Sequence, residues 1–198
     1  MYPFANQADA ILNTRLAADA AGATKMDRPE WGAVDPVTGD GYMTLTNNVA
    51  ALRTLAATDA ANPRHYNDPK TVGGVTTNQF GNPNGHIIRW KEPSPEATTF
   101  TWDIFLFGAR AGASPPTVNL SGLDADNDFS SPDGLWFSPK TNILWIQTDD
   151  GAFTDVTNCM LLAALPGAVG DGGAKTITNT DQAGATKQVT TYAGAQLG

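Results

Sequence analysis

The residues most able to do chemistry lie in a short string, Met26-Asp27-Arg28-Pro29-Glu30-Trp31, where an arginine and a carboxylate flank a proline. Because the proline ring fixes φ, Arg28 and Glu30 can be held toward one site. A guanidinium binds phosphate through two parallel hydrogen bonds, and a glutamate oxygen binds a hard cation such as Ca²⁺. The string therefore fits a phosphate or cation site, and a surface Arg28–Glu30 ion pair is the alternative.

A second group of acids lies farther along the chain. Asp124, Asp126 and Asp128 alternate in sequence, and Asp133 follows in a Ser-Pro-Asp string. The spacing resembles the start of an EF-hand calcium loop, but the later glycine and glutamate of such a loop are missing. An irregular, oxygen-rich calcium site is one interpretation, and a solvated acidic loop is the other.

Both groups adjoin a sequence that occurs twice, at residues 29–48 and 132–150. Each copy alternates in hydrophobicity around a central turn, which predicts a β-hairpin. The copies start 103 residues apart, about two repeats of ~40–50 residues, the size of a propeller blade. The pattern predicts that Glu30 and Asp133 lie at equivalent ends of two blades. We align the copies with one extra residue near Gly41 in the first.

The rest of the chain predicts a mainly β protein, an incomplete propeller with one N-terminal helix. Residues 6–22 carry apolar side chains at helical spacing, with Asn6 as the cap. We expect residues 1–165 to form the partial propeller and residues 166–198, rich in Gly, Ala and Thr, to form a weakly ordered tail. Two or three blades do not close a ring, which needs at least about four.

The composition limits the possible partners. A net charge of −8 over 198 residues argues against binding to nucleic acids or anionic membranes, and it fits either cation binding or plain solubility. The single cysteine, Cys159, cannot form a disulfide within the chain and is interpreted as a packed residue. His65 and His86 lack zinc-site spacing, and His86 is interpreted as a structural hydrogen-bonding residue. No signal peptide is recognisable, and no apolar stretch is long enough to span a bilayer.

Several strings, in a fixed order, resemble the PhoX-type alkaline phosphatases. They are residues 16–19, 22–31, 45–48, 62–64, 85–90, 131–137 and 144–149. The resemblance implies a six-bladed propeller with iron and calcium at the mouth of its channel. It also implies hydrolysis of phosphomonoesters in the periplasm or outside the cell.

Carried over residue by residue, the resemblance makes Arg28 the phosphate-binding arginine and Glu30 a metal-bridging carboxylate. Asp133 is the further implied metal ligand, with Asp128 as the alternative. The implied cofactors are Ca²⁺ and Fe³⁺. The chain is much shorter than such enzymes and lacks their upstream half, so we expect a fragment that is inactive alone and whose missing blades are encoded separately.

Two other functions stay open. A calcium-stabilised propeller module without catalysis would need the acids but not Arg28. A lactonase-like hydrolase would also use calcium-binding acids on a propeller, and the scarcity of histidine counts against it.

Overall fold

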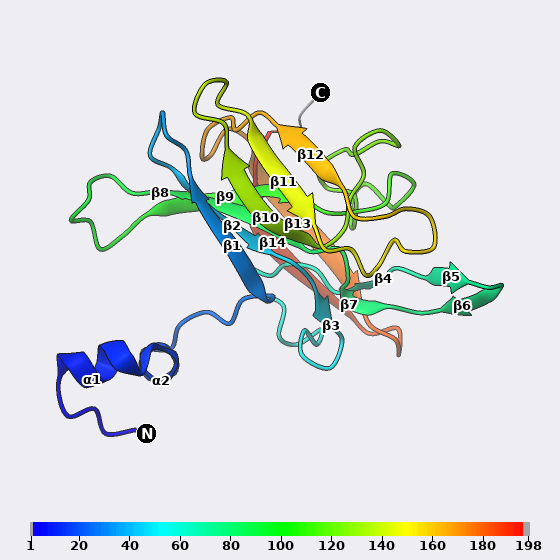
Figure 1. Cartoon of the computed structure of the whole chain (residues 1–198). Helices are drawn as coiled ribbons and strands as arrows, with labels where there is room; N and C mark the ends of the chain where they lie inside the picture. The colour runs from blue at the N-terminus through cyan, green and yellow to red at the C-terminus, as the bar shows by residue number, and fades with distance from the viewer. Residues whose placement is uncertain (1, 196–198) are drawn as a thin grey trace.

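A six-stranded sheet forms the centre of the fold in the computed structural model, which describes residues 2–195 (Figure 1). Its strand order is β1-β2-β8-β9-β14-β13. The strands are β1 (Pro29–Val34), β2 (Gly41–Leu45), β8 (His86–Lys91), β9 (Thr101–Phe107), β13 (Gly173–Thr180) and β14 (Thr186–Ala193). Every neighbouring pair is antiparallel except β14 and β9, which meet in parallel where Ala193 lies opposite Ile104.

A three-stranded sheet packs against the first and lies in front of it in Figure 1. It contains β10 (Pro132–Phe137), β11 (Leu144–Thr148) and β12 (Leu161–Ala164). The main hydrophobic core fills the space between the two sheets, because the inward residues of both alternate with outward ones. Its buried members include Tyr42, Ile87, Phe105, Leu106, Leu135, Phe137, Leu144 and Ile146.

The remaining strands are short. β3 (Asn48–Val49), β7 (Phe80–Asn82) and β4 (Tyr66–Asn67) form one small sheet. β5 (Lys70–Val72) and β6 (Val75–Thr77) form a hairpin that projects from the body, as Figure 1 shows.

The duplicated sequence forms two matching hairpins, β1–β2 and β10–β11. Pro29 pairs with Leu45 in the first, and Pro132 pairs with Thr148 in the second. The register shifts immediately after each proline, so both first strands carry a bulge at the same place. The predicted hairpins are confirmed, but the predicted extra residue near Gly41 is wrong, because the offset of 103 residues holds through both second strands.

The prediction of a mainly β protein is confirmed, whereas the described strands form no closed propeller. Four of the strands in the large sheet, β1-β2-β8-β9, form an antiparallel meander, the number that makes up a propeller blade. The β10–β12 sheet is a second meander of three strands.

The single helix expected at residues 6–22 is divided into α1 (Gln7–Leu12) and α2 (Thr14–Ala20). Asn6 is the predicted cap, and its side chain accepts a hydrogen bond from Asp9 N at 3.0 Å. The helix is interrupted at Asn13, whose side-chain amide bonds to both the carbonyl and the carboxylate of Asp9. Asparagine competes for local backbone groups in this way, which the apolar spacing alone does not reveal.

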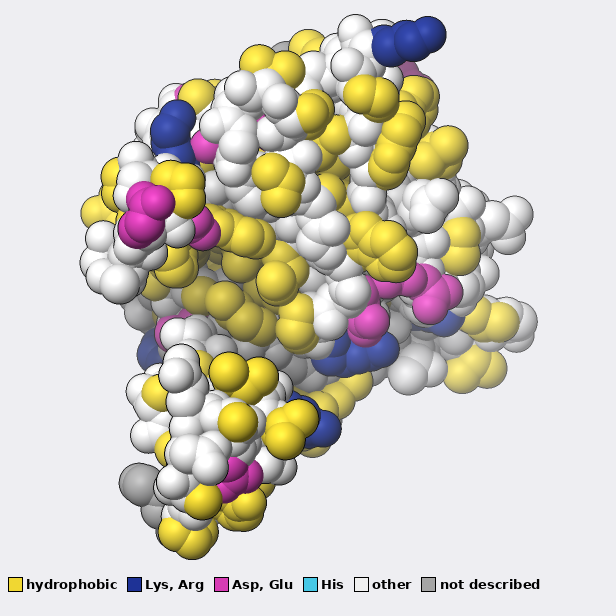
Figure 2. Space-filling model, turned by 60° about the vertical axis from the view of Figure 1, so that its left-hand side comes forward, with side chains coloured by type: hydrophobic (Ala, Val, Ile, Leu, Met, Phe, Trp, Pro, Cys, Tyr) yellow, Lys and Arg dark blue, Asp and Glu magenta, His cyan; other side chains and the backbone are white. Residues whose placement is uncertain are grey.

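No residue of either helix is buried, and the apolar Leu12 side chain is 84% exposed. The helices extend from the body in Figure 1, and Figure 2 shows hydrophobic side chains both on this helical segment and on the neighbouring face of the body. Neither α1, with 6 residues, nor α2, with 7 residues, is long enough to cross a bilayer.

Residues 166–198 were expected to form a tail, but β13 and β14 place most of this segment in the large sheet. Ile177, Val189 and Ala193 are buried on the inner side of the hairpin. Asp171 adds an ion pair, with its Oδ1 atom 2.6 Å from the buried guanidinium of Arg89. The segment therefore belongs to the sheet rather than to a separate tail.

This packing predicts that the C-terminal hairpin stabilises the whole fold. Truncating the fully buried side chain in Ile177→Ala should lower the free energy of unfolding by about 2–5 kcal/mol, because apolar contacts are lost and a cavity forms. Val75→Ala, in an exposed strand, is the matched control and should change it by less than about 0.5 kcal/mol. Urea unfolding followed by circular dichroism gives both values. Equal stability of the two variants would show that the hairpin does not contribute.

Candidate functional site

Each repeat begins with a residue in a left-handed backbone conformation. Arg28 has φ 51° and Ser131 has φ 53°, and each directly precedes a proline. Residues with a Cβ atom seldom adopt this conformation, and a residue before proline normally has an extended one. Such strain costs roughly 1–3 kcal/mol and persists only where the surrounding structure enforces it. Its recurrence at both strand starts marks these two positions as structurally specialised.

The hydroxyl of Thr44 joins the two strand starts. This buried Oγ1 atom accepts a hydrogen bond from Trp31 N at 3.0 Å and donates one to Asp133 O at 2.7 Å. Because Glu30 directly precedes Trp31, the structure brings Glu30 and Asp133 to the same end of two adjacent hairpins. The sequence repeat predicts this juxtaposition.

The Arg28 guanidinium makes one hydrogen bond and one long ion pair with neighbouring side chains. Its Nη1 atom donates to Asn47 Oδ1 at 2.8 Å, and its Nη2 atom lies 3.6 Å from Glu30 Oε1. The Arg28 and Glu30 side chains are 57% and 37% exposed, so this long ion pair contributes at most about 1 kcal/mol. Within the described residues Nε makes no hydrogen bond, so the Nε–Nη2 edge carries only the long contact from Nη2 to Glu30.

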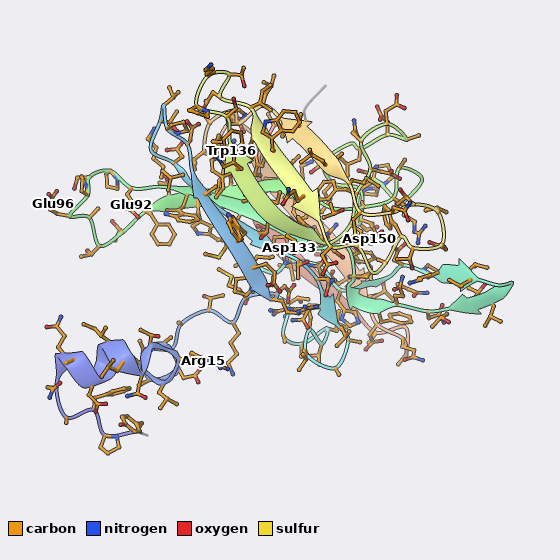
Figure 3. The ribbon with its side chains drawn as sticks, viewed as in Figure 1. Arg15, Glu92, Glu96, Asp133, Trp136 and Asp150 are labelled. Atoms are coloured by element: carbon orange, nitrogen blue, oxygen red, sulfur yellow. The ribbon has the colours of Figure 1, made fainter. Side chains whose placement is uncertain are left out.

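Asp133 lies at the start of β10, and Figure 3 shows it at the same end of the β10–β11 hairpin as Asp150. Its carboxylate makes no hydrogen bond or ion pair with any described residue. It adjoins a pocket of about 550 Å³. The other pocket-lining residues are Trp31, Gly134, Leu135, Trp136, Trp145, Gln147 and Leu161. Asp133 therefore lies beside a pocket lined by three tryptophans, and its carboxylate oxygens are not bonded to any described residue.

The acids of residues 124–128 have structural contacts. Asp128 Oδ2 accepts a hydrogen bond from Ala111 N at 3.0 Å, and Asp124 Oδ1 accepts one from Asp126 N at 2.9 Å. Asp128 also lines a different pocket from Asp133, beside Arg110. The structure thus brings Arg28, Glu30 and Asp133 to one place and leaves Asp128 in another.

Sequence reasoning missed the role of Asp27, whose carboxylate is completely buried. Its Oδ1 atom accepts hydrogen bonds from Arg53 Nε at 2.7 Å and Asn48 Nδ2 at 2.8 Å, and Oδ2 accepts one from Asn82 Nδ2 at 3.0 Å. Asp27 directly precedes Arg28, so this network fixes the backbone that presents the guanidinium. The spacing of residues in the sequence does not predict this network, because the partners of Asp27 lie 21 to 55 residues away in the chain.

His86 extends the same network and is a structural hydrogen-bonding residue, as interpreted from the sequence. Its Nε2 atom donates to the Ala61 carbonyl at 2.8 Å, which leaves Nδ1 to accept from Asn82 Nδ2 at 3.1 Å. This arrangement suits a neutral ring. Burial lowers the pKa of His86 to about 4, against attraction from Asp27 that raises it.

Comparison with known proteins agrees with these features. The family model described as "Alkaline phosphatase PhoX" matches residues 2–196. The chain belongs to the PhoX alkaline phosphatase family. The resemblance inferred from the sequence strings is confirmed. No curated protein matches the chain.

A solved structure is also similar, described as "Pseudomonas fluorescens PhoX in complex with vanadate, a transition state analogue". The TM-score is 0.65 and the sequence identity is 31%. The match covers 89% of this chain and 31% of the Pseudomonas fluorescens chain. The present chain therefore spans less than a third of the PhoX chain that it matches.

The His86 environment predicts a pH dependence of stability. Below the usual pKa of 6.5 the unfolded chain gains a proton that the folded chain does not accept until about pH 4. The contribution of His86 is therefore complete above pH 6.5 and is lost as the pH falls toward 4, by at most about 1.4 kcal/mol per pH unit. Urea unfolding across this range should show a shallower pH slope in His86→Gln than in the unchanged protein. Equal slopes would contradict the assignment.

Proposed function

We propose that this chain supplies part of the phosphate- and metal-binding site of a PhoX-type phosphomonoesterase. The observation that carries the proposal is the placement of Arg28, whose Nε atom has no partner among the described residues, next to Glu30 and near the two strand starts that Thr44 joins through Trp31 and Asp133. Membership of the PhoX alkaline phosphatase family supports it. The vanadate bound to Pseudomonas fluorescens PhoX, named as a transition state analogue, supports a phosphate-like ligand.

In this proposal Arg28 binds the phosphoryl group. The Nε and Nη2 atoms present two parallel N–H groups that match two phosphoryl oxygens. Asn47 binds Nη1, and the only protein contact on the Nε–Nη2 edge among the described residues is the 3.6 Å one from Nη2 to Glu30. A preorganised cationic donor stabilises negative charge that increases on the oxygens in the transition state, and this stabilisation accelerates the reaction.

Glu30 and Asp133 are the proposed metal ligands, and Ca²⁺ and Fe³⁺ are the proposed cofactors. Carboxylate oxygens suit hard cations, and Ca²⁺ takes 6–8 oxygen ligands. Residues 2–195 contain no group of three or more His, Cys, Asp or Glu side chains that could hold a metal ion. The two carboxylates therefore fit as part of a ligand set, and we propose that the others come from outside these 198 residues. When bound, the cations would polarise the phosphoryl oxygens and activate an oxygen nucleophile.

The remaining family properties are proposals of the same kind. The two meanders would be parts of a PhoX-type propeller, the substrate would be a phosphomonoester, and the protein would act in the periplasm or outside the cell. The isolated chain would be inactive, and nucleic acids and membranes would not be partners. The alternative remains a calcium-stabilised module without catalysis, which would not need Arg28.

Replacing Arg28 distinguishes the enzyme from that alternative. Arg28→Lys keeps the charge but loses the planar two-pronged contact, so kcat/KM for an aryl phosphate should fall by ~10²–10³-fold, as for other preorganised donors. Arg15→Lys, on the exposed helical segment labelled in Figure 3, is the control and should leave the rate unchanged. Both variants should retain the Tm of the unchanged protein. The assay requires the chain with the other parts of the PhoX site, and undiminished turnover by a folded Arg28→Lys protein would refute the role of Arg28.

Metal content separates the two candidate aspartates. After equilibration with Ca²⁺ and Fe³⁺ in the presence of the other parts of the PhoX site, Asp133→Asn and Glu30→Gln should each lower the metal bound per chain, because an amide is a weaker cation ligand than a carboxylate. Asp128→Asn should not, because its remaining oxygen can still accept the hydrogen bond from Ala111. Mass spectrometry of the purified proteins measures the bound metals. Loss of metal in Asp128→Asn alone would make Asp128 the ligand instead of Asp133.

A further inference from the structure

We propose that Asn47 is a positioning residue that holds the Arg28 guanidinium and links it to Ser131 in the second repeat. The inference rests on the proposed role of Arg28 as the phosphate-binding residue. It assigns to Asn47 no contact with the substrate.

Both ends of the Asn47 amide are occupied. Oδ1 accepts a hydrogen bond from Arg28 Nη1 at 2.8 Å, and Nδ2 donates one to Ser131 Oγ at 3.1 Å. A flipped amide would turn its N–H groups toward the guanidinium, which has only donors. The guanidinium of Arg28 therefore fixes the orientation of the Asn47 amide. The amide in turn holds Arg28 at a fixed position relative to Ser131.

Ser131 is a rigid anchor for this link. It is completely buried, its N–H donates to Asn84 O at 3.0 Å, and its carbonyl accepts from Asp149 N at 3.0 Å. Its hydroxyl also lies 3.0 Å from Ser130 Oγ. Arg28, by contrast, is mostly exposed, and its only other side-chain partner among the described residues is Glu30 at 3.6 Å. Without Asn47, little would restrict the guanidinium.

The repeat explains why Ser131 is the residue reached. It stands 103 residues after Arg28, the offset of the two hairpins, and has the same left-handed backbone conformation. Asn47 follows β2 of the first repeat, so its amide bridges the equivalent strand starts of both repeats. The left-handed backbone at Arg28 and at Ser131 thus places the arginine guanidinium and the serine hydroxyl on opposite sides of the Asn47 amide.

A positioned arginine binds phosphate better because less side-chain freedom is lost on binding. The expected consequence is selective: removal of the Asn47 amide should weaken phosphate binding and leave the Arg28 charge and the fold unchanged.

The test uses the whole chain and two readouts. The first is the ¹H–¹⁵N nuclear Overhauser effect at Arg28 Nε, which reports side-chain order. It should fall in Asn47→Ala, fall less in Ser131→Ala, and be retained in Asn47→Asp, which keeps the oxygen acceptor. Asn78→Ala, which removes an exposed hydrogen bond to Asn67, is the control and should leave the signal unchanged.

The second readout is the affinity for inorganic phosphate by calorimetry, measured with the other parts of the PhoX site present and after loading with Ca²⁺ and Fe³⁺ and removal of unbound metal. Asn47→Ala should weaken binding by roughly three- to tenfold, the loss of one exposed hydrogen bond to a charged group. An unchanged Nε signal in Asn47→Ala overturns the inference whether or not phosphate binds. A reduced signal with unchanged phosphate affinity also overturns it. Failure of the unchanged protein to bind phosphate, in the presence of the other parts of the PhoX site, counts against the proposed function, whereas a reduced Nε signal in Asn47→Ala then still supports the contact inferred for Asn47.

Discussion

The position of the candidate site depends on the buried carboxylate of Asp27. A charge removed from water is costly unless hydrogen bonds and an opposite charge compensate it. Asp27 has both hydrogen bonds and an opposite charge nearby. Arg53, Asn48 and Asn82 donate three N–H groups to its two oxygens, and Arg53 carries the positive charge. These partners come from separate loops and strands, so the carboxylate ties the segment before β1 to the body. The next residue is Arg28, whose side chain leaves the protein where this buried network ends.

Hydrogen bonds to the neighbouring strand also hold the strained backbones of Arg28 and Ser131 in place. Thr46 N donates to Arg28 O at 3.2 Å, and Asp149 N donates to Ser131 O at 3.0 Å. Each left-handed residue is thus bonded to the residue after the second strand of its own hairpin. These bonds extend the antiparallel pairing by one residue beyond Pro29 and Pro132, and so hold each left-handed residue at the start of its hairpin. The bond from Thr44 to Asp133 then fixes one hairpin against the other.

The parts of this arrangement that the sequence predicts are local. Alternating side chains and central turns identify the hairpins, and the repeated Pro-acid pair places Glu30 and Asp133 at equivalent strand starts. The Asp27 network could not be predicted, because its partners meet only after the strands pair. The C-terminal hairpin was missed for another reason. Its strands alternate mainly through threonine and small residues, and few large apolar side chains, such as Ile177, mark the buried face.

The arginines show why position, rather than residue type, separates structure from function. Arg64 is completely buried and donates to the carbonyls of Gly108 and Val118, and Arg89 binds both oxygens of Asp103. The fold uses most of the hydrogen-bonding capacity of these two side chains. Arg28 lies at the surface, and its Nε atom has no hydrogen-bond partner among the described residues.

Charge balance adds a condition to the proposed function. Glu30 pairs with Arg28, and Asp133 adds a second negative charge at the adjoining strand start, in a chain whose net charge is already −8. A phosphate dianion would be repelled by both carboxylates at close range. Binding of phosphate next to Arg28 therefore requires further positive charge at the carboxylates. Asp133 has no ion-pair partner among the described residues, and Glu30 has only the long, exposed contact with Arg28. Two carboxylates so weakly compensated, near an exposed arginine, are the arrangement expected of a site that binds cations and phosphate together.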